Sequence, residues 1–453
     1  MNRQELRLIV AGTALIGVSY GLARFAYGLF LPSMREDVGL SSAMAGAIGS
    51  GAYVGYCLAI VASAMLVERF GARLMAVAAA LIAAAGMAVV SISESPLLLA
   101  GAILLAGTST GLASPPMAQA VARAIPEARQ SRANTIINAG TSLGVAISGP
   151  VAFLATGQWR VAYAAFAITA LVNAVLLLLS VPRPPATETR VNVAPKAGKD
   201  SSQQEGRQNR GGLWRAPAWR VMLAAAGTGI ASAAYWTFSS EAVVTQGNFD
   251  QTVANIVWIL IGVAGLVGGL AGDLVKRFGL DVVNRGSLGA LALSLCLLAL
   301  LPASLPAMLV SATLFGGAYI MLTGVYLVWG IRLYADRPAI GLGLPFLMIA
   351  VGQIVGSPLA GYLIGSRGYA FCFIVFALIA VATMLVGYRA DGPRSDAATD
   401  RGDCARREEP RAQQPSIPRF YMPAMPPLGL IENIGRSFKG GLGSGIDRRC
   451  SRR

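Results

Sequence analysis

The sequence predicts an all-α integral membrane protein with twelve transmembrane helices in two six-helix halves. Three observations predict this fold class. Hydrophobic residues make up 55% of the 453-residue chain and charged residues only 13%, whereas about a quarter of an average soluble domain is charged. Apolar runs long enough to span a bilayer recur along the chain. A constant offset of 208 residues relates features of the first six runs to features of the last six.

The predicted spans follow from the length that a helix needs to cross a bilayer, about 17–25 apolar residues. They lie at 8–32, 43–66, 74–92, 97–119, 134–155, 161–181, 220–242, 253–272, 286–305, 307–330, 341–364 and 369–388. The first run is too long for a cleaved signal sequence, and further spans follow it. The spans divide the chain into an N-terminal half (1–181), a linker (182–219), a C-terminal half (220–388) and a tail (389–453).

The linker and the tail differ in composition from the spans. They are rich in Pro, Arg, Gln, Gly and Asp and poor in long apolar runs. Such segments cannot bury enough apolar surface to offset the entropy of ordering. We therefore expect a flexible cytoplasmic linker and a disordered cytoplasmic tail.

The orientation follows from the Lys and Arg residues in short loops, which favour the cytoplasmic side. If the N-terminus is cytoplasmic, the inner loops carry ten such residues and the outer loops three. The outer three are Arg35, Arg160 and Arg367. The sequence therefore predicts a multi-pass protein of the cell (inner) membrane with both termini in the cytoplasm.

Composition also narrows the classes of ligand and partner. The chain contains no histidine, and its five cysteines have neither metal-ligand nor disulfide-framework spacing, so we expect no metal, no disulfide and no cofactor. The net charge of +15 is assigned to loops and tails rather than to a nucleic-acid-binding face. No phosphate-binding loop of the Gly-x-x-x-x-Gly-Lys-Ser/Thr type is present, so the chain itself does not hydrolyse ATP. The expected partners are a small-molecule solute and the lipid bilayer, and we expect a monomer.

The two halves share residues at the offset of 208. The pairs are Arg69-Phe70-Gly71 with Arg277-Phe278-Gly279, Gly144 with Gly352, Pro150 with Pro358, and Gly21, Tyr27 and Phe30 with Gly229, Tyr235 and Phe238. Six spans is an even number, so each span and its counterpart cross the membrane in the same direction. The sequence therefore predicts a parallel repeat about a pseudo-two-fold axis along the membrane normal.

The segment from Ala64 to Arg73 resembles the signature loop between the second and third helices of the major facilitator superfamily (MFS). The usual form is Gly-x-Leu-x-Asp-Arg-x-Gly-Arg-Lys, and here Ala64 replaces the first Gly and Glu68 the Asp. A second copy runs from Gly272 to Gly279, with Lys276 in the acidic position. The resemblance implies a solute transporter that works by alternating access, with a conformational latch formed by Glu68, Arg69, Gly71, Arg73, Lys276, Arg277 and Gly279. The alternative is ordinary cytoplasmic loop charge.

The first span, Tyr20 to Pro32, is similar to bacterial permeases of the YbfB/YjiJ type, a resemblance that names no substrate. Within it, Arg24 lies well inside the membrane, where a charge costs at least a few kcal/mol and therefore faces a cavity or a partner. No acid lies at comparable depth in any span. A guanidinium without a buried acid suggests an anionic ligand, because its fork matches a carboxylate. Alternatively, Arg24 extends to the interface or bonds helix carbonyls.

Other candidates for the substrate site accompany Arg24. Tyr20 and Tyr27 lie four residues before and three after it, on the same helix face. The resemblance implies that spans one, four, seven and ten line the path, helped by two, five, eight and eleven. Polar residues in those spans are Tyr53, Tyr56, Asn138, Thr141, Ser232, Tyr235, Tyr319, Thr323, Tyr326 and Gln353. Each could equally form an interhelical hydrogen bond, and Trp236 and Phe238 could be a binding wall or packing.

The leading hypothesis is a secondary active or facilitative transporter of a small solute, and Arg24 suggests that the solute is an organic anion. Drug or metabolite efflux by proton antiport is the alternative, although proton coupling normally uses a carboxylate or histidine at depth. A membrane-embedded sensor or enzyme is an alternative of another class, and an enzyme would require clustered catalytic side chains inside the membrane. The sequence places no such cluster there.

Overall fold

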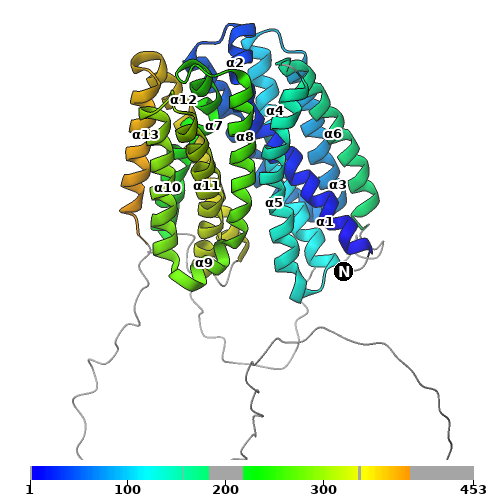
Figure 1. Cartoon of the computed structure of the whole chain (residues 1–453). Coiled ribbons are helices and arrows are strands. Elements are labelled where there is room, and N and C mark those ends of the chain that lie inside the picture. The colour runs from blue at the N-terminus through cyan, green and yellow to red at the C-terminus, as the bar shows by residue number, and fades with distance from the viewer. Residues whose placement is uncertain (1–2, 156, 183–217, 335–337, 388–453) are drawn as a thin grey trace, which may run out of the picture. The chain divides into compact units, whose positions relative to one another are not determined.

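The computed structural model describes residues 3–155, 157–182, 218–334 and 338–387, and these are arranged as helices without a strand (Figure 1). They all belong to one unit, Met1–Ala390. The predicted linker 182–219, except for residues 182, 218 and 219, lies outside the described residues. The whole of the predicted tail 389–453 lies outside them too. The prediction of an all-helical protein is confirmed for the described part of the chain.

The first six predicted spans form a continuous series of helices. These are α1 (Arg3–Ile16), η1 (Gly17–Phe25), α2 (Ala26–Val38), α3 (Ser42–Ser91), α4 (Pro96–Ala124), α5 (Glu127–Leu154) and α6 (Trp159–Ser180). The first span is one helix of 36 residues, Arg3–Val38, made from α1, η1 and α2. The second and third spans are both contained in α3.

The last six predicted spans form the second series. These are α7 (Ala218–Thr245), α8 (Gln251–Gly265), η3 (Leu266–Leu270), α9 (Ala271–Phe278), α10 (Leu280–Leu300), α11 (Leu305–Leu333), α12 (Pro338–Arg367) and α13 (Tyr369–Met384). Within the described residues, eleven helices are long and apolar enough to cross a membrane. The twelfth predicted span coincides with the shorter apolar helix α13. The predicted boundaries differ from the helix ends by several residues, because the helices continue into the polar loops.

Two glycines at the offset of 208 have the same backbone conformation. Gly71 has φ 79° and ψ 160° and divides α3 into two spans. Gly279 has φ 86° and ψ 155° between α9 and α10. A positive φ is accessible to glycine at little cost and strained for other residues. Both copies of the signature loop therefore reverse the chain by the same turn.

Small residues let the first span in each series of helices, which we call the N-terminal and the C-terminal half, pack closely against the fifth. A Cβ atom at Gly21 in η1 would collide with the backbone of Gly144 in α5. A Cβ atom at Gly229 in α7 would likewise collide with the backbone of α12 at Ile349 and approach Gly352. Large apolar side chains instead face outward, as Leu154 (84% exposed) and Leu179 (75% exposed) do. This arrangement suits a lipid surround, in which close backbone packing replaces a hydrophobic driving force between helices.

The two halves meet at the end of the bundle opposite the N-terminus, which we call the closed end. There α12 packs against α3, and α2 packs against α7. Gly46 and Gly361 have no room for a Cβ atom, because the backbones of Ser357 and Ser42 lie against them. α5 and α8 continue this contact toward the middle, where Gly262 approaches Ala146. Toward the end that carries the N-terminus, the ribbons of the two halves diverge (Figure 1).

Candidate functional site

Arg24 lies in η1, a nine-residue stretch of π-helix from Gly17 to Phe25. The expectation of a regular α-helix through the first span is therefore wrong over these residues. π-helical turns are rare and occur frequently at functional sites. Gly17 and Gly21, on the same stretch, pack against the backbone of α5, so the wide turn is held against its neighbour by close backbone contact.

The guanidinium of Arg24 is buried among aromatic rings. The residue is 7% exposed. Its guanidinium carbon lies 4.4 Å from the ring centroid of Tyr53, 4.9 Å from that of Tyr56, 5.1 Å from that of Phe25 and 5.7 Å from that of Tyr20. Rings at these distances attract a cation through their π-electron faces. Arg24 therefore lies inside the bundle and does not extend to an outer surface.

Arg24 connects the two halves through a hydrogen-bonded chain. Its Nη2 donates to Oε1 of Gln353 on α12 at 2.9 Å, and Nε2 of Gln353 donates to the hydroxyl of Tyr319 on α11 at 3.3 Å. Gln353 is fully buried. Within the described residues Arg24 forms no ion pair, and its Nε has no hydrogen-bond partner. The site thus has one buried cation with an unused donor.

Aromatic side chains from both halves pack beside Arg24. We call Phe25, Trp236, Trp258, Phe315 and Tyr319 the central aromatic cluster. Phe25 stacks on Trp236 with ring centroids 4.0 Å apart, and Trp236 meets Phe315 and Tyr319 edge to face, each at 5.2 Å. Trp258 contacts Trp236 at 5.8 Å. The indole N–H groups of Trp236 and Trp258 are buried and have no hydrogen-bond partner in the part of the chain that is described.

Six predicted site residues come together at this point: Arg24, Tyr20, Tyr53, Tyr56, Tyr319 and Gln353. The hydroxyl of Tyr20 also shares a hydrogen bond of 3.0 Å with Ser114 on α4. Tyr235 lies at the edge of the cluster, stacked on Phe315 at 3.8 Å and hydrogen-bonded to Ser311 at 2.9 Å. Trp236, predicted as either a wall or packing, belongs to the cluster itself.

The remaining predicted site residues make local contacts. Tyr27 donates to the carbonyl of Ala45 at 2.9 Å, Ser232 to that of Gly229 at 3.1 Å, and Thr323 to that of Ile320 at 2.7 Å. Asn138 is exposed on α5.

Sequence reasoning missed Phe25, Trp258 and Phe315. Phe25 directly follows Arg24, and Phe315 lies four residues before Tyr319, so helical spacing could have indicated both. Nothing in the sequence around Trp258 distinguishes it from a packing residue.

An ion pair joins the halves at the closed end. Nη1 of Arg35 on α2 donates to Oε1 of Glu241 on α7. The side chain of Arg35 is 22% exposed and that of Glu241 is 6% exposed. One helix turn away, the hydroxyls of Thr237 and Ser357 are 3.3 Å apart and bridge α7 and α12. The sequence placed Arg35 in an outer loop but could not pair it with Glu241 across the halves.

The comparison with known protein families decides the family of this chain. The model of the Major Facilitator Superfamily matches residues 13–344. The chain belongs to the Major Facilitator Superfamily. The resemblance inferred from the signature loop is therefore confirmed, and family membership indicates a transporter rather than an enzyme.

Named relatives within the superfamily agree with this assignment. The hexuronate transporter of Bacillus subtilis (strain 168) is 28% identical over 193 residues, which are 42% of this chain and 45% of that protein. The nucleoside transporter NupG superposes with a TM-score of 0.64 at 12% identity, covering 85% of this chain and 99% of that one. The partially occluded inward-open xylose transporter XylE from E. coli gives a TM-score of 0.66 at 18% identity, covering 85% and 97%. The structural matches establish the MFS fold alone.

The superfamily's signature loop lies at the end of the bundle that carries the N-terminus. The guanidinium of Arg69 lies 5.5 Å from the ring of Phe70, and that of Arg277 lies 5.2 Å from the ring of Phe278, the same contact in both copies. Arg73 donates to the carbonyl of Leu178 on α6. Glu68 and Lys276 are exposed, and Glu68 forms no hydrogen bond or ion pair with a described residue. The predicted latch remains a prediction.

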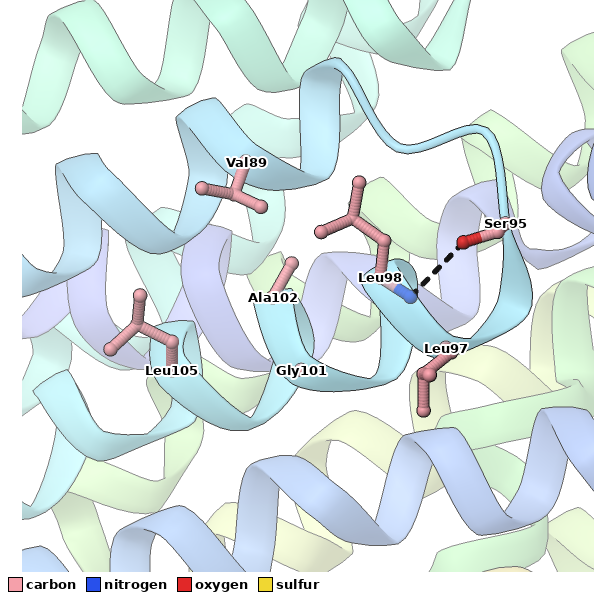
Figure 2. A pocket seen from close by; sticks show the side chains of 7 residues that line it. All are labelled: Val89, Ser95, Leu97, Leu98, Gly101, Ala102 and Leu105. Atoms are coloured by element: carbon pink, nitrogen blue, oxygen red, sulfur yellow. Dashed lines mark hydrogen bonds between the residues drawn. The ribbon is translucent and has the colours of Figure 1, made fainter.

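A separate cavity of about 350 Å³ lies between α3 and α4, away from Arg24. Figure 2 shows its lining, which is apolar except for Ser95, whose hydroxyl accepts a hydrogen bond from the backbone N–H of Leu98 at 3.3 Å. Leu97 in this lining is 84% exposed. The cavity therefore opens on the outer surface of one half, where an MFS protein meets lipid, and offers a solute no charged group.

The described residues contain no group of three or more His, Cys, Asp or Glu side chains that could hold a metal ion. The chemistry that the Arg24 site offers is recognition: a buried cation, unused N–H donors and flat apolar surfaces.

Proposed function

We propose that the protein is a secondary active or facilitative transporter that moves a small organic anion across the cell membrane by alternating access. One observation carries the proposal: Arg24 is a buried cation at the junction of the two halves and forms no ion pair among the described residues. Removing a charge from water costs several kcal/mol per ion. A cation–π contact returns about 0.5–2 kcal/mol. A bound anion would supply the strong interaction that the protein itself does not provide.

The arrangement of the helices supports alternating access between two six-helix halves related by an axis along the membrane normal. Gly21 with Gly144 and Gly229 with Gly352 form equivalent close contacts in the two halves, at the offset of 208. With both termini in the cytoplasm, the closed end is extracellular, and the ribbons of the two halves diverge toward the cytoplasm (Figure 1). The Arg35–Glu241 ion pair then holds the extracellular side shut. Opening that side requires the pair to separate.

The similarity to the hexuronate transporter favours an anionic solute. Hexuronates are carboxylates, and the hexuronate transporter shares 28% identity over 42% of this chain. The match spans less than half of that transporter, so it supports the class of solute and not its identity. A guanidinium can pair bidentately with a carboxylate, which agrees with Arg24 as the residue that anchors the solute.

The test is a flux and binding series at Arg24. The purified protein is reconstituted in liposomes, and uptake of radiolabelled carboxylates is measured beside the shift in melting temperature that they cause. Because ligand binding to the folded state raises stability, the parent should be stabilised by its anion. Arg24→Lys should weaken both signals, since a lysine lacks the planar fork, and Arg24→Ala should abolish them.

Arg160→Ala is the matched control, because Arg160 pairs with Asp37 within the N-terminal half at the closed end. It should leave anion binding unchanged. Flux at the parental rate through correctly folded Arg24→Ala protein would contradict the proposal.

A further inference from the structure

We propose that the solute is a small carboxylate with a largely apolar ring as its body, as in an aromatic or alicyclic acid, and not a polyhydroxylated sugar acid. This rests on the proposed function, in which Arg24 anchors an anion, and adds the chemical class of the remainder of the solute.

The first argument is the position of the aromatic rings. Phe25 adjoins the guanidinium of Arg24 at 5.1 Å and stacks on Trp236 at 4.0 Å. Phe25 belongs to the N-terminal half and Trp236 to the C-terminal half. A movement that separates the halves at the closed end would part this stack and present both faces beside the cation. A flat ring can then occupy the position of one partner, since aromatic pairs prefer stacked or edge-to-face contact.

The second argument is the type of polar atom left without a partner. At Arg24 and in the central aromatic cluster these atoms are Nε of Arg24, Nε1 of Trp236 and Nε1 of Trp258, and all three are buried. Each is an N–H donor with no acceptor function. An unsatisfied buried donor costs about 1–3 kcal/mol. A ligand that completes this site therefore brings acceptors, and a carboxylate with a further carbonyl or ether oxygen does so.

The third argument excludes a polyol. Two polar side chains beside Arg24 already have partners: Gln353 bonds Arg24 and Tyr319, and the hydroxyl of Tyr20 bonds Ser114. A sugar acid carries several hydroxyls, and each one buried without a partner costs free energy. The rings of Phe25, Tyr53 and Tyr56 surround the guanidinium, and their faces favour an apolar body.

The experiment compares four probes on the purified full-length protein in lipid nanodiscs. Benzoate and cyclohexanecarboxylate combine a carboxylate with an apolar ring. D-glucuronate retains the carboxylate on a polyhydroxylated ring, and benzyl alcohol retains the ring without the charge. We expect the first two to raise the melting temperature at concentrations where the last two do not, and Arg24→Ala to remove the effect.

Two variants test the aromatic part separately from the anion anchor. Trp236→Phe keeps a ring and removes the indole N–H. It should weaken binding of a fifth probe, 4-hydroxybenzoate, whose phenol oxygen can accept from that N–H, about fivefold to tenfold, the equivalent of about one hydrogen bond. Trp236→Leu removes the ring and should lessen the preference for benzoate over D-glucuronate. Tyr163→Phe is the control, because the hydroxyl of Tyr163 is also buried without a partner. The ring of Tyr163 packs on Phe30 and Phe166 within one half, away from the central aromatic cluster.

The outcomes separate the two proposals. If D-glucuronate binds as tightly as benzoate and its binding needs Arg24, the ring inference is overturned and the anion proposal stands. If Trp236→Phe and Trp236→Leu bind every probe as the parent does, the aromatic cluster has no part in recognition. If no carboxylate stabilises the protein, or Arg24→Ala binds them unchanged, the anion proposal itself fails.

Discussion

Replacing Glu241 with glutamine should shift the protein toward the state in which its closed end is open. The carboxylate of Glu241 accepts a hydrogen bond from Arg35, and this pair connects α7 to α2 and so one half to the other. Glutamine keeps the shape of the side chain and removes its charge. The pair exists only while the closed end is shut, so its loss destabilises that state alone.

The magnitude follows from burial. A hydrogen bond that involves a charged group contributes about 1.5–3 kcal/mol. The side chain of Glu241 is 6% exposed but that of Arg35 is 22% exposed, so solvent screening places the value at the low end, about 1.5 kcal/mol. Since each 1.4 kcal/mol is a factor of ten in an equilibrium constant, the ratio of molecules open at this end to molecules shut should rise about tenfold.

The assay measures labelling of one cysteine buried at the closed end. Ser357 is fully buried and contacts Thr237, so Ser357→Cys reacts with a membrane-impermeant maleimide only when the halves separate there. The five native cysteines are replaced first. Glu241→Gln should raise the rate of labelling about tenfold, and exchanging the two charges, Arg35→Glu with Glu241→Arg, should return it toward the parental rate.

The matched control is Asp37→Asn. Asp37 pairs with Arg160 at the same end of the bundle, but both residues belong to the N-terminal half. Its loss should leave the labelling rate unchanged. The reasoning is refuted if Glu241→Gln labels at the parental rate, or if Asp37→Asn accelerates labelling as much as Glu241→Gln does.

Three further predictions concern other parts of the chain. Gly21→Val should lower the melting temperature by the equivalent of about 1–3 kcal/mol, because even a Cβ atom there meets the backbone of Gly144. Gly101→Ala is the control and should be neutral, because nothing lies near its added carbon. Equal melting temperatures for the two variants would contradict the prediction. Gly71→Ala should destabilise the folded protein by about 1 kcal/mol through its positive φ, which thermal unfolding of the two proteins measures. If Glu68 latches the opposite state, Glu68→Gln should change the labelling of Ser357→Cys, and identical rates would remove Glu68 from that role.

The glycines that recur at the offset of 208 could be read from the sequence because their positions rest on simple backbone requirements. A glycine is needed where φ is positive, as at Gly71 and Gly279, and where backbones touch, as at Gly21 and Gly229. These needs are imposed by the chain's own geometry, so they leave the same residue in both copies. Long apolar runs can also be recognised in the sequence, because a helix needs a minimum apolar length to span a bilayer.

The composition of the site could be predicted only in part. A charge inside an apolar span is conspicuous, so Arg24 was found, together with the polar candidates Tyr319 and Gln353. Phe25, Phe315 and Trp258 were not found, because aromatic residues are as common in packing as in binding sites. The π-helix at Gly17–Phe25 was not expected either, since no residue in that segment demands it over an α-helix.

By itself, the sequence determined that this protein is a helical membrane protein with one charge deep inside its first span, because hydropathy and charge are properties of single segments. Only the tertiary structure decided that Arg24 meets Gln353, 329 positions further along the chain, that Phe25 stacks on Trp236, and that Arg35 pairs with Glu241. Each of these contacts joins the two halves. Which faces of two halves meet depends on how whole helices pack, and no local pattern records it.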